Sequence, residues 1–110
     1  MRILALPIAL AFSVAALSAP ALAQSATVRL TLKDGRFEPA QTTAPANQRL
    51  TIIVKNAERT PAEFESNTLR VEKVVTPGAT IELHIRPLNP GRYRFFNDFH
   101  QQTDGYLVVK

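Results

Sequence analysis

Apolar and polar residues alternate with a period of two along most of the chain after residue 26. The clearest runs lie at residues 27–33, 49–56 and 80–86, and shorter ones lie at 41–44, 70–75, 93–96 and 106–109. Alternation of this kind indicates strands that bury one face and expose the other. Gly and Pro residues between the runs supply turns, and two prolines confine residues 41–44 to a sheet edge.

Residues 57–69 lack a clear two-residue period and are predicted to form a long loop, with one helical turn near residues 61–64. No segment shows the pattern of an amphipathic helix. Seven or eight short strands separated by turns predict an all-β fold, an antiparallel β-sandwich with Greek-key connections. A long loop in so small a domain is usually functional.

The first residues have the features of an export signal. One positive charge is followed by an apolar run that ends in small residues at Ala21-Leu22-Ala23. This pattern predicts a cleaved signal peptide at residues 1–23 and a single domain at residues 24–110. We therefore expect an exported protein, and the alternative, an uncleaved membrane anchor, is disfavoured by Pro7 and Pro20.

The amino-acid composition excludes several kinds of site and partner. There is no cysteine, which excludes disulfides, thiolate metal sites and thiol redox chemistry. Without Arg2, twelve Lys and Arg stand against nine Asp and Glu, and the basic residues are scattered along the sequence. We expect no nucleic-acid partner, because such binding needs basic residues clustered on one face. The charge instead favours solubility and a mild preference for anionic surfaces.

The candidate site lies in two loops. His100 and Asp98 fall in a predicted polar loop between the last two strands, and Glu63 and Glu65 fall in the predicted loop of residues 57–69. If the sandwich brings both loops to one end, carboxylates and one imidazole converge there. Such ligands suit iron, manganese, zinc or cupric ion better than cuprous ion, which favours sulfur.

Each candidate also has an ordinary explanation. His100 is also compatible with a surface histidine, and Asp98 with a turn cap. Glu65 is also compatible with an ion pair to a nearby Arg or Lys, and Glu63 with a solvated side chain. His84 falls on the outward face of its strand, where a solvated position is the simpler interpretation. The aromatic residues, Phe99 included, are expected to anchor the core and loops.

Several motifs resemble those of the cupredoxins, the small exported copper proteins. They are Phe37-x-Pro39, Pro77-Gly78, Pro90-Gly91-x-Tyr93-x-Phe95 and Gly105-x-Leu107-x-Val109. The resemblance implies ligand positions at Asn97 for cysteine, His100 for histidine and Thr103 for methionine, with a further histidine position near residues 63–65. Only one of these four ligands, His100, is present, so the chain cannot build a type 1 copper site.

A closer resemblance is to the cupredoxin-like proteins that accompany bacterial high-affinity iron permeases, including the cupredoxin domain of elemental ferrous iron transporters. It rests on Thr60-Pro61-Ala62-Glu63-Phe64-Glu65-Ser66, on Leu69-x-x-Glu72-Lys73, and on the run from Pro87 to His100. It implies a periplasmic protein of iron uptake that binds iron or copper and works with a membrane permease and other uptake components.

Three functions remain open on the sequence. The first is metal binding in ferrous iron uptake through Glu63, Glu65, Asp98 and His100. The second is a metal-free adaptor of the same fold that docks on a membrane transporter or sensor. The third, an enzyme that oxidises ferrous iron, is disfavoured, because a site with a single histidine offers no obvious redox route.

Overall fold

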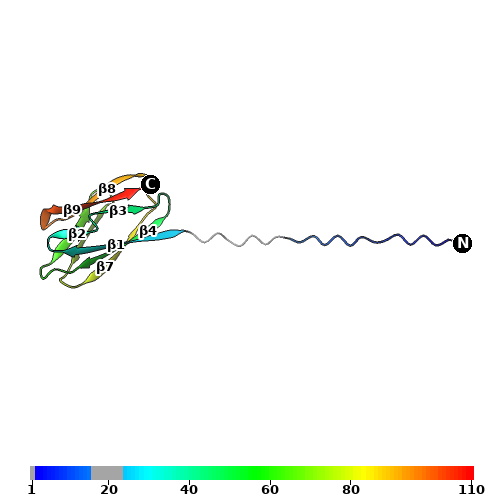
Figure 1. Ribbon diagram of the computed structural model, residues 1–110, viewed down its shortest axis with the longest axis horizontal. Helices are drawn as coiled ribbons and strands as arrows, with labels where there is room; N and C mark the ends of the chain where they lie inside the picture. Colours follow the sequence, from blue (N-terminus) through cyan, green and yellow to red (C-terminus); the bar gives the residue numbers. More distant parts are fainter. Residues whose placement is uncertain (1, 16–23) are drawn as a thin grey trace.

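The computed structural model describes residues 2–15 and 24–110. Within these residues there is no helix, and nine strands form two sheets that stack as a sandwich (Figure 1). The strands are β1 (Ser25–Lys33), β2 (Arg36–Glu38), β3 (Gln41–Ala44), β4 (Arg49–Asn56), β5 (Ala62–Ser66), β6 (Val71–Val75), β7 (Thr80–Ile85), β8 (Gly91–Asn97) and β9 (His100–Val109). The prediction of an all-β sandwich is confirmed.

One sheet has four strands in the order β2-β1-β4-β7, and the other has five in the order β3-β9-β8-β5-β6. The sheets are mixed, because β1 pairs with β4 and β3 with β9 in parallel. The purely antiparallel arrangement predicted from the sequence is therefore wrong. The chain passes from β2 in the four-stranded sheet to β3 in the five-stranded sheet, and then returns to the four-stranded sheet as β4. There β4 runs in the same direction as its neighbour β1.

The core lies between the sheets and is filled by the inward positions of the alternating strands. Three phenylalanines from both sheets meet at its centre. The ring of Phe37 packs edge-on against Phe64 and Phe95, with centroids 5.9 and 5.1 Å apart, and Phe64 stacks on Phe95 at 5.4 Å. Such edge-on and offset contacts between aromatic rings favour one defined arrangement of the two layers.

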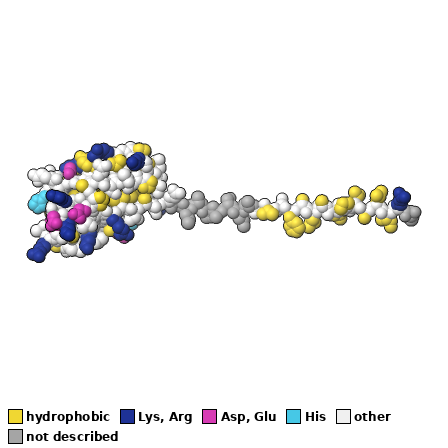
Figure 2. Space-filling view, in the orientation of Figure 1, with side chains coloured by type: hydrophobic (Ala, Val, Ile, Leu, Met, Phe, Trp, Pro, Cys, Tyr) yellow, Lys and Arg dark blue, Asp and Glu magenta, His cyan; other side chains and the backbone are white. Residues whose placement is uncertain are grey.

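Residues 2–15 lie outside this core. They form no helix or strand, and their apolar side chains are exposed, as the extended segment in Figure 2 shows. No described pairing or core contact involves them, and the nine strands and the described core all lie within residues 25–109. The predicted cleavage motif at residues 21–23 lies outside the described residues, and the division at residue 23 stays a prediction. None of the described residues forms a helix with the length and apolarity that a membrane span requires.

Residues 57–69 are not one long loop, since β5 occupies residues 62–66 and no helical turn forms there. Ala62, Phe64 and Ser66 are buried, whereas the two glutamates between them are half-buried. The strand therefore has the two-residue period. It is hard to recognise in the sequence because the strand has only five residues and one of its buried positions is the polar residue Ser66. Pairing with β6 on one side and β8 on the other stabilises this short strand.

The polar loop expected at residues 97–105 is also shorter than predicted. Strands β8 and β9 pair almost to their ends, and residues 98 and 99 form the turn. A bulge accommodates residues 101–103, because Asn97 pairs with His100 while Phe96 pairs with Asp104. Asp104, which falls within the predicted polar loop, lies in β9, where its carboxylate binds Nε of Arg94 at 2.9 Å. Phe99 was predicted to be an anchor, but it is 48% exposed at this turn.

Candidate metal centre

Three glutamates gather on the outer face of the five-stranded sheet. Glu63 and Glu65 project outward from β5 because the residues between and beside them face the core. Glu72 projects from β6, directly opposite Glu65 in the antiparallel pairing. One ligand oxygen from each of the three lies within 4.8 Å of the others. We refer to Glu63, Glu65 and Glu72 as the glutamate cluster.

The charges of this cluster are not balanced by direct ion pairs. In the part of the chain that the structure describes, the one ion pair within 4 Å joins Arg94 and Asp104, outside the cluster. A depression of about 240 Å³ opens beside the cluster and gives solvent access to it; its lining residues are Glu65, Ser66, Asn67, Arg70, Val71 and Glu72. Three carboxylates at this distance repel one another unless a proton or a cation lies between them.

Proton affinity in the cluster reflects this repulsion. A hydrogen bond with the Glu72 carboxyl, partial burial and the nearby negative charges raise the pKa of Glu63 from 4.5 to about 7. Partial burial raises the pKa of Glu65, and the charges of Asp98 and Glu72 raise it further. The hydrogen bond between two carboxyl groups needs a proton on one of them. In the absence of a cation, the cluster therefore holds a proton at pH values where an isolated glutamate does not.

Asp98 lies beside the cluster at the β8–β9 turn. Its negative charge contributes to the raised pKa of Glu63 and of Glu65, and its Oδ1 accepts a 2.8 Å bond from Nε2 of Gln101. The backbone N–H of Asp98 donates to the carbonyl oxygen of Glu63 at 2.9 Å. The turn is thus fastened to β5, and a fourth carboxylate is held next to the three glutamates.

Asn97, at the position that the cupredoxin resemblance assigns to a cysteine ligand, has a structural role. Its side chain is buried, and its Oδ1 accepts the backbone N–H of Glu63 at 3.0 Å and that of Phe99 at 3.2 Å. These bonds join β5 to the β8–β9 turn from inside. An amide in this position is a poor copper ligand compared with a thiolate, so the residues present do not fit a type 1 centre.

His100 is the first residue of β9 and is exposed. It is not one of the residues whose ligand atoms converge within 4.8 Å, which among the described residues are the three glutamates. Its role as a ligand, like that of the other predicted residues, stays a prediction. His84 is exposed on the other sheet, with Nδ1 3.5 Å from Oγ1 of Thr51.

Glu72 was not among the candidate ligands predicted from the sequence. Its position follows from the hairpin of β5 and β6, which places Glu72 across from Glu65. Recognising residues 62–66 as a strand would have identified it, because two strands joined by a short turn pair across that turn.

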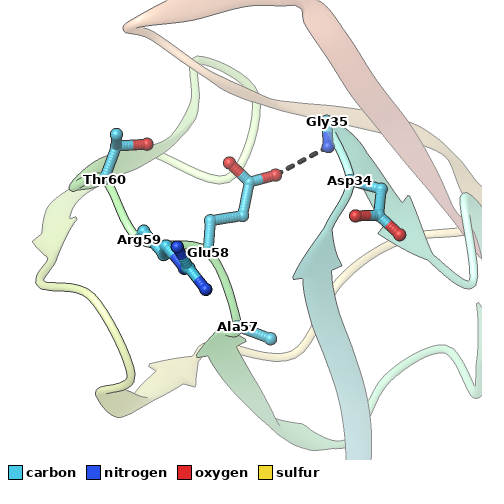
Figure 3. A pocket seen from close by; sticks show the side chains of 6 residues that line it. All are labelled: Asp34, Gly35, Ala57, Glu58, Arg59 and Thr60. Atoms are coloured by element: carbon cyan, nitrogen blue, oxygen red, sulfur yellow. Dashed lines mark hydrogen bonds between the residues drawn. The ribbon is translucent and has the colours of Figure 1, made fainter.

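A second hollow, of about 400 Å³, lies between the β1–β2 turn and the segment after β4. Figure 3 shows that Glu58 points toward the β1–β2 turn, where its Oε1 accepts the backbone N–H of Gly35 at 2.7 Å. The carboxylate of Asp34 points away from Glu58. The Glu58 carboxylate in this hollow therefore already has a structural partner, and the Asp34 carboxylate does not turn toward it.

Comparisons with known proteins agree with the fold. A family described as the cupredoxin-like domain matches residues 4–109. An uncharacterized protein of Rickettsia prowazekii (strain Madrid E) is 41% identical over 83 residues, which are 74% of this chain. The chain spans 66% of the length of that relative.

Among solved structures, the metal-binding domain of the Cu(I)-exporting P-type ATPase CopA of Streptococcus pneumoniae D39, determined with Cu(I), superposes with a TM-score of 0.71. It is 15% identical, and the match covers 82% of this chain and 91% of that one. Auracyanin A, a blue copper protein of Chloroflexus aurantiacus, superposes with a TM-score of 0.67 at 15% identity, covering 79% of this chain and all of that one. These likenesses concern the fold, and they agree with the family match over nearly the whole chain. The protein therefore belongs to the family of cupredoxin-like domains.

Proposed function

We propose that this protein binds an iron ion through the glutamate cluster and acts as an exported component of iron uptake beside a membrane permease. The observation that carries the proposal is the convergence of three carboxylates within 4.8 Å, on adjacent strands and without a directly bound Lys or Arg among the described residues. Carboxylates gathered in this way are the ligands that hard cations require.

Electrostatics favours a cation over a proton at this position. The carboxyl groups are only half-buried or exposed, so water and ions reach them from the adjacent depression. A cation relieves the repulsion among all the carboxylates, whereas one proton relieves it for one pair. Binding then releases the proton that the cluster holds, and affinity rises with pH.

The kind of ligand atom in the glutamate cluster restricts which metal ion it can bind. Oxygen ligands without sulfur disfavour cuprous ion and favour ferrous, ferric or manganous ion. Asp98, whose charge raises the pKa of Glu65, is a candidate fourth carboxylate next to the three that converge within 4.8 Å. His100 is close along the chain and would add an imidazole, which also suits iron and cupric ion. Cupric ion is therefore the alternative cargo, bound without a type 1 centre.

The role in iron uptake is supported by the resemblance of the motifs around residues 60–66 and 87–100 to those of cupredoxin-like proteins that accompany iron permeases. The glutamate cluster belongs to this stretch of the sequence. A periplasmic location next to a permease follows from that resemblance and from the predicted signal peptide. Transient binding on exposed carboxylates suits a protein that passes its ion on.

A metal-free adaptor is the second candidate, and one observation favours it. The two large apolar side chains that are most exposed in the domain, Val74 and Phe99, both lie next to the candidate site. Val74 is paired with Glu63 across β5 and β6, and Phe99 follows Asp98 in the β8–β9 turn. Apolar side chains at the edge of a polar site are typical of a docking surface for another protein.

Calorimetric titration separates the two functions. Residues 24–110 are titrated with ferrous ion under anaerobic conditions, and with manganous, zinc and cupric ions, at pH 7.5 and at pH 5. We expect one bound ferrous or manganous ion at pH 7.5. Removal of one ligand charge by Glu72→Gln is expected to weaken binding about tenfold or more.

Glu82→Gln is the matched control, because Glu82 is an exposed glutamate in the middle of a strand of the other sheet. Equal weakening by both substitutions would indicate non-specific attraction to acidic residues and would contradict the site. Absence of binding of all four ions would favour the adaptor. In that case, Phe99→Ser should reduce binding to a permease partner.

A further inference from the structure

The outer face of the four-stranded sheet gathers half of the basic residues of the domain. Strand alternation sends the apolar residues of β1 and β4 into the core and the residues between them outward. The exposed Lys and Arg on this face, which we name the basic face, are Arg29, Lys33, Arg36, Arg49, Lys55 and Arg86. Two acidic residues, Glu38 and Glu82, lie among them.

These residues are scattered in the sequence, and the sheet register brings them together. Lys33 of β1 is paired directly with Arg36 of β2. Arg49 and Lys55 of β4 lie on the same face of the sheet and are paired with the uncharged residues Ser25 and Thr31 of β1. Arg86 follows β7, the neighbour of β4, and shares with Arg49 and His84 the lining of a hollow of about 500 Å³. The basic residues are scattered along the sequence, and six of the twelve in residues 24–110 share this face of the sheet.

Fold stability does not account for this arrangement. Lys33 and Arg36 lie directly opposite each other across β1 and β2, and like charges in that position destabilise a sheet. No ion pair in the described residues involves the basic face, since the one that occurs joins Arg94 and Asp104 on the other sheet. Six basic and two acidic residues give this face a formal charge of +4, which favours an anionic partner.

The chemistry of the face distinguishes among anionic partners. A protein interface usually has a buried apolar centre with large anchoring side chains. In the described domain, the most exposed large apolar residues, Val74 and Phe99, both belong to the other sheet. The basic residues lie on β1, β2 and β4 and just after β7, and the apolar residue among them, Ile53, is half-buried. Such a surface suits an extended, laterally continuous layer of negative charge.

We propose that the basic face docks on an anionic phospholipid bilayer, held by lipid phosphate groups. Peripheral attraction of clustered Lys and Arg to acidic lipids needs no insertion of apolar side chains. Figure 2 shows Lys and Arg side chains along the lower margin of the domain, the side on which Figure 1 draws β1 and β7, and others along its upper margin. Docking there leaves the opposite sheet, with the glutamate cluster, turned away from the lipid.

Vesicle sedimentation tests this directly. Residues 24–110 are mixed with phosphatidylcholine vesicles with and without phosphatidylglycerol. We expect binding to the acidic vesicles alone, and its loss when salt rises from about 0.05 M to about 0.5 M. Arg49→Gln with Arg86→Gln is expected to lower the partition coefficient about 30-fold, as two phosphate-binding side chains are lost.

The matched control is Arg59→Gln with Arg92→Gln, which removes the same charge from positions outside the basic face. An equal loss in the control, or no binding of the unaltered protein to acidic vesicles, would overturn the proposal. So would tighter binding to a short DNA duplex than to the vesicles at equal salt, or a dimer at low salt that the Arg49 and Arg86 substitutions abolish. Circular dichroism of each variant checks that the sandwich is intact.

This inference does not depend on the proposed iron site. Glu72→Gln should leave vesicle binding unchanged, and the Arg49 and Arg86 substitutions should leave ferrous ion binding unchanged. Failure of one experiment therefore leaves the other informative.

Discussion

At the scale of single residues, the glutamates of this domain differ by their neighbours. Glu58 has a structural role, because its carboxylate accepts a backbone N–H from the β1–β2 turn. Glu82 is exposed on β7. Glu63 and Glu65 lie in a group of acidic side chains, and this position raises the pKa of both. The same residue type thus serves as a turn acceptor, a surface charge or a member of a candidate cation site.

The raised pKa of Glu63 predicts how stability depends on pH. In the unfolded chain this carboxyl loses its proton near pH 4.5, and in the folded protein it does so at about pH 7. Between these values the folded state binds more protons than the unfolded state, so the free energy of unfolding falls as pH rises. Below pH 4.5 both states are protonated and the stabilising effect is fully present. Above about pH 7 it is lost.

Urea denaturation of the metal-free domain between pH 4 and pH 8 measures this effect. We expect Glu63→Gln to flatten the fall in stability between pH 4.5 and about pH 7, because its side chain cannot titrate. Glu82→Gln is expected to keep the pH dependence of the unaltered protein. A Glu63→Gln variant with an unchanged pH dependence would contradict the assignment of this titration to the glutamate cluster.

At the scale of elements, the β8–β9 hairpin depends on close packing at one glycine. A Cβ atom on Gly105 would lie 2.5 Å from the carbonyl oxygen of Ala40 and 2.5 Å from the ring of Phe95. The ring belongs to the aromatic centre of the core, and the carbonyl is backbone, so neither can move freely. The glycine in the closing motif of the sequence therefore permits β9 to approach the core and the segment before β3.

Gly105→Ala is expected to lower the free energy of unfolding by about 1–3 kcal/mol, the usual cost of overpacking a core. Chemical denaturation followed by circular dichroism measures it. Gly91→Ala is the control in the same hairpin, because a Cβ there would approach the Tyr93 ring no closer than 3.6 Å. Equal stability of both variants would show that the hairpin tolerates a side chain at residue 105.

The sequence predicted the elements whose apolar alternation is long. The strands at residues 27–33, 49–56 and 80–86 form as expected, with the predicted apolar residues inward. It failed at β5, where glutamates occupy the outward positions of a five-residue strand, and at the bulge of β9, which the Arg94–Asp104 pair helps to fix. Such features depend on partners distant in the sequence, which periodicity does not show.

The candidate site, like the strands, could be predicted from the sequence only in part. Glu63 and Glu65, both candidates from the sequence, lie on one face of β5, although the sequence placed them in a loop. Glu72 was missed because its proximity depends on the register of β5 against β6. The sequence also could not show that Asn97 binds two backbone N–H groups, since these bonds exist only once β5 lies beside the turn.

At the scale of the whole molecule, the two sheets carry different charge on their outer faces. The four-stranded sheet presents the basic face, and the five-stranded sheet presents the glutamate cluster with Asp98 beside it. A formal net charge for the chain averages over this division and conceals it. The two proposals accordingly assign lipid attraction to one sheet and ion binding to the other.

The most direct test of ion binding is to locate the ion by nuclear magnetic resonance. Manganous ion is added in small amounts to isotope-labelled residues 24–110 at pH 7.5, and paramagnetic broadening of the amide signals is followed. We predict that signals of residues 63–65, 72 and 96–98 broaden first, while those of β1 and β7 remain sharp. Broadening centred on other residues would contradict ion binding at the glutamate cluster. The same broadening in the Glu72→Gln variant as in the unaltered protein would also contradict it.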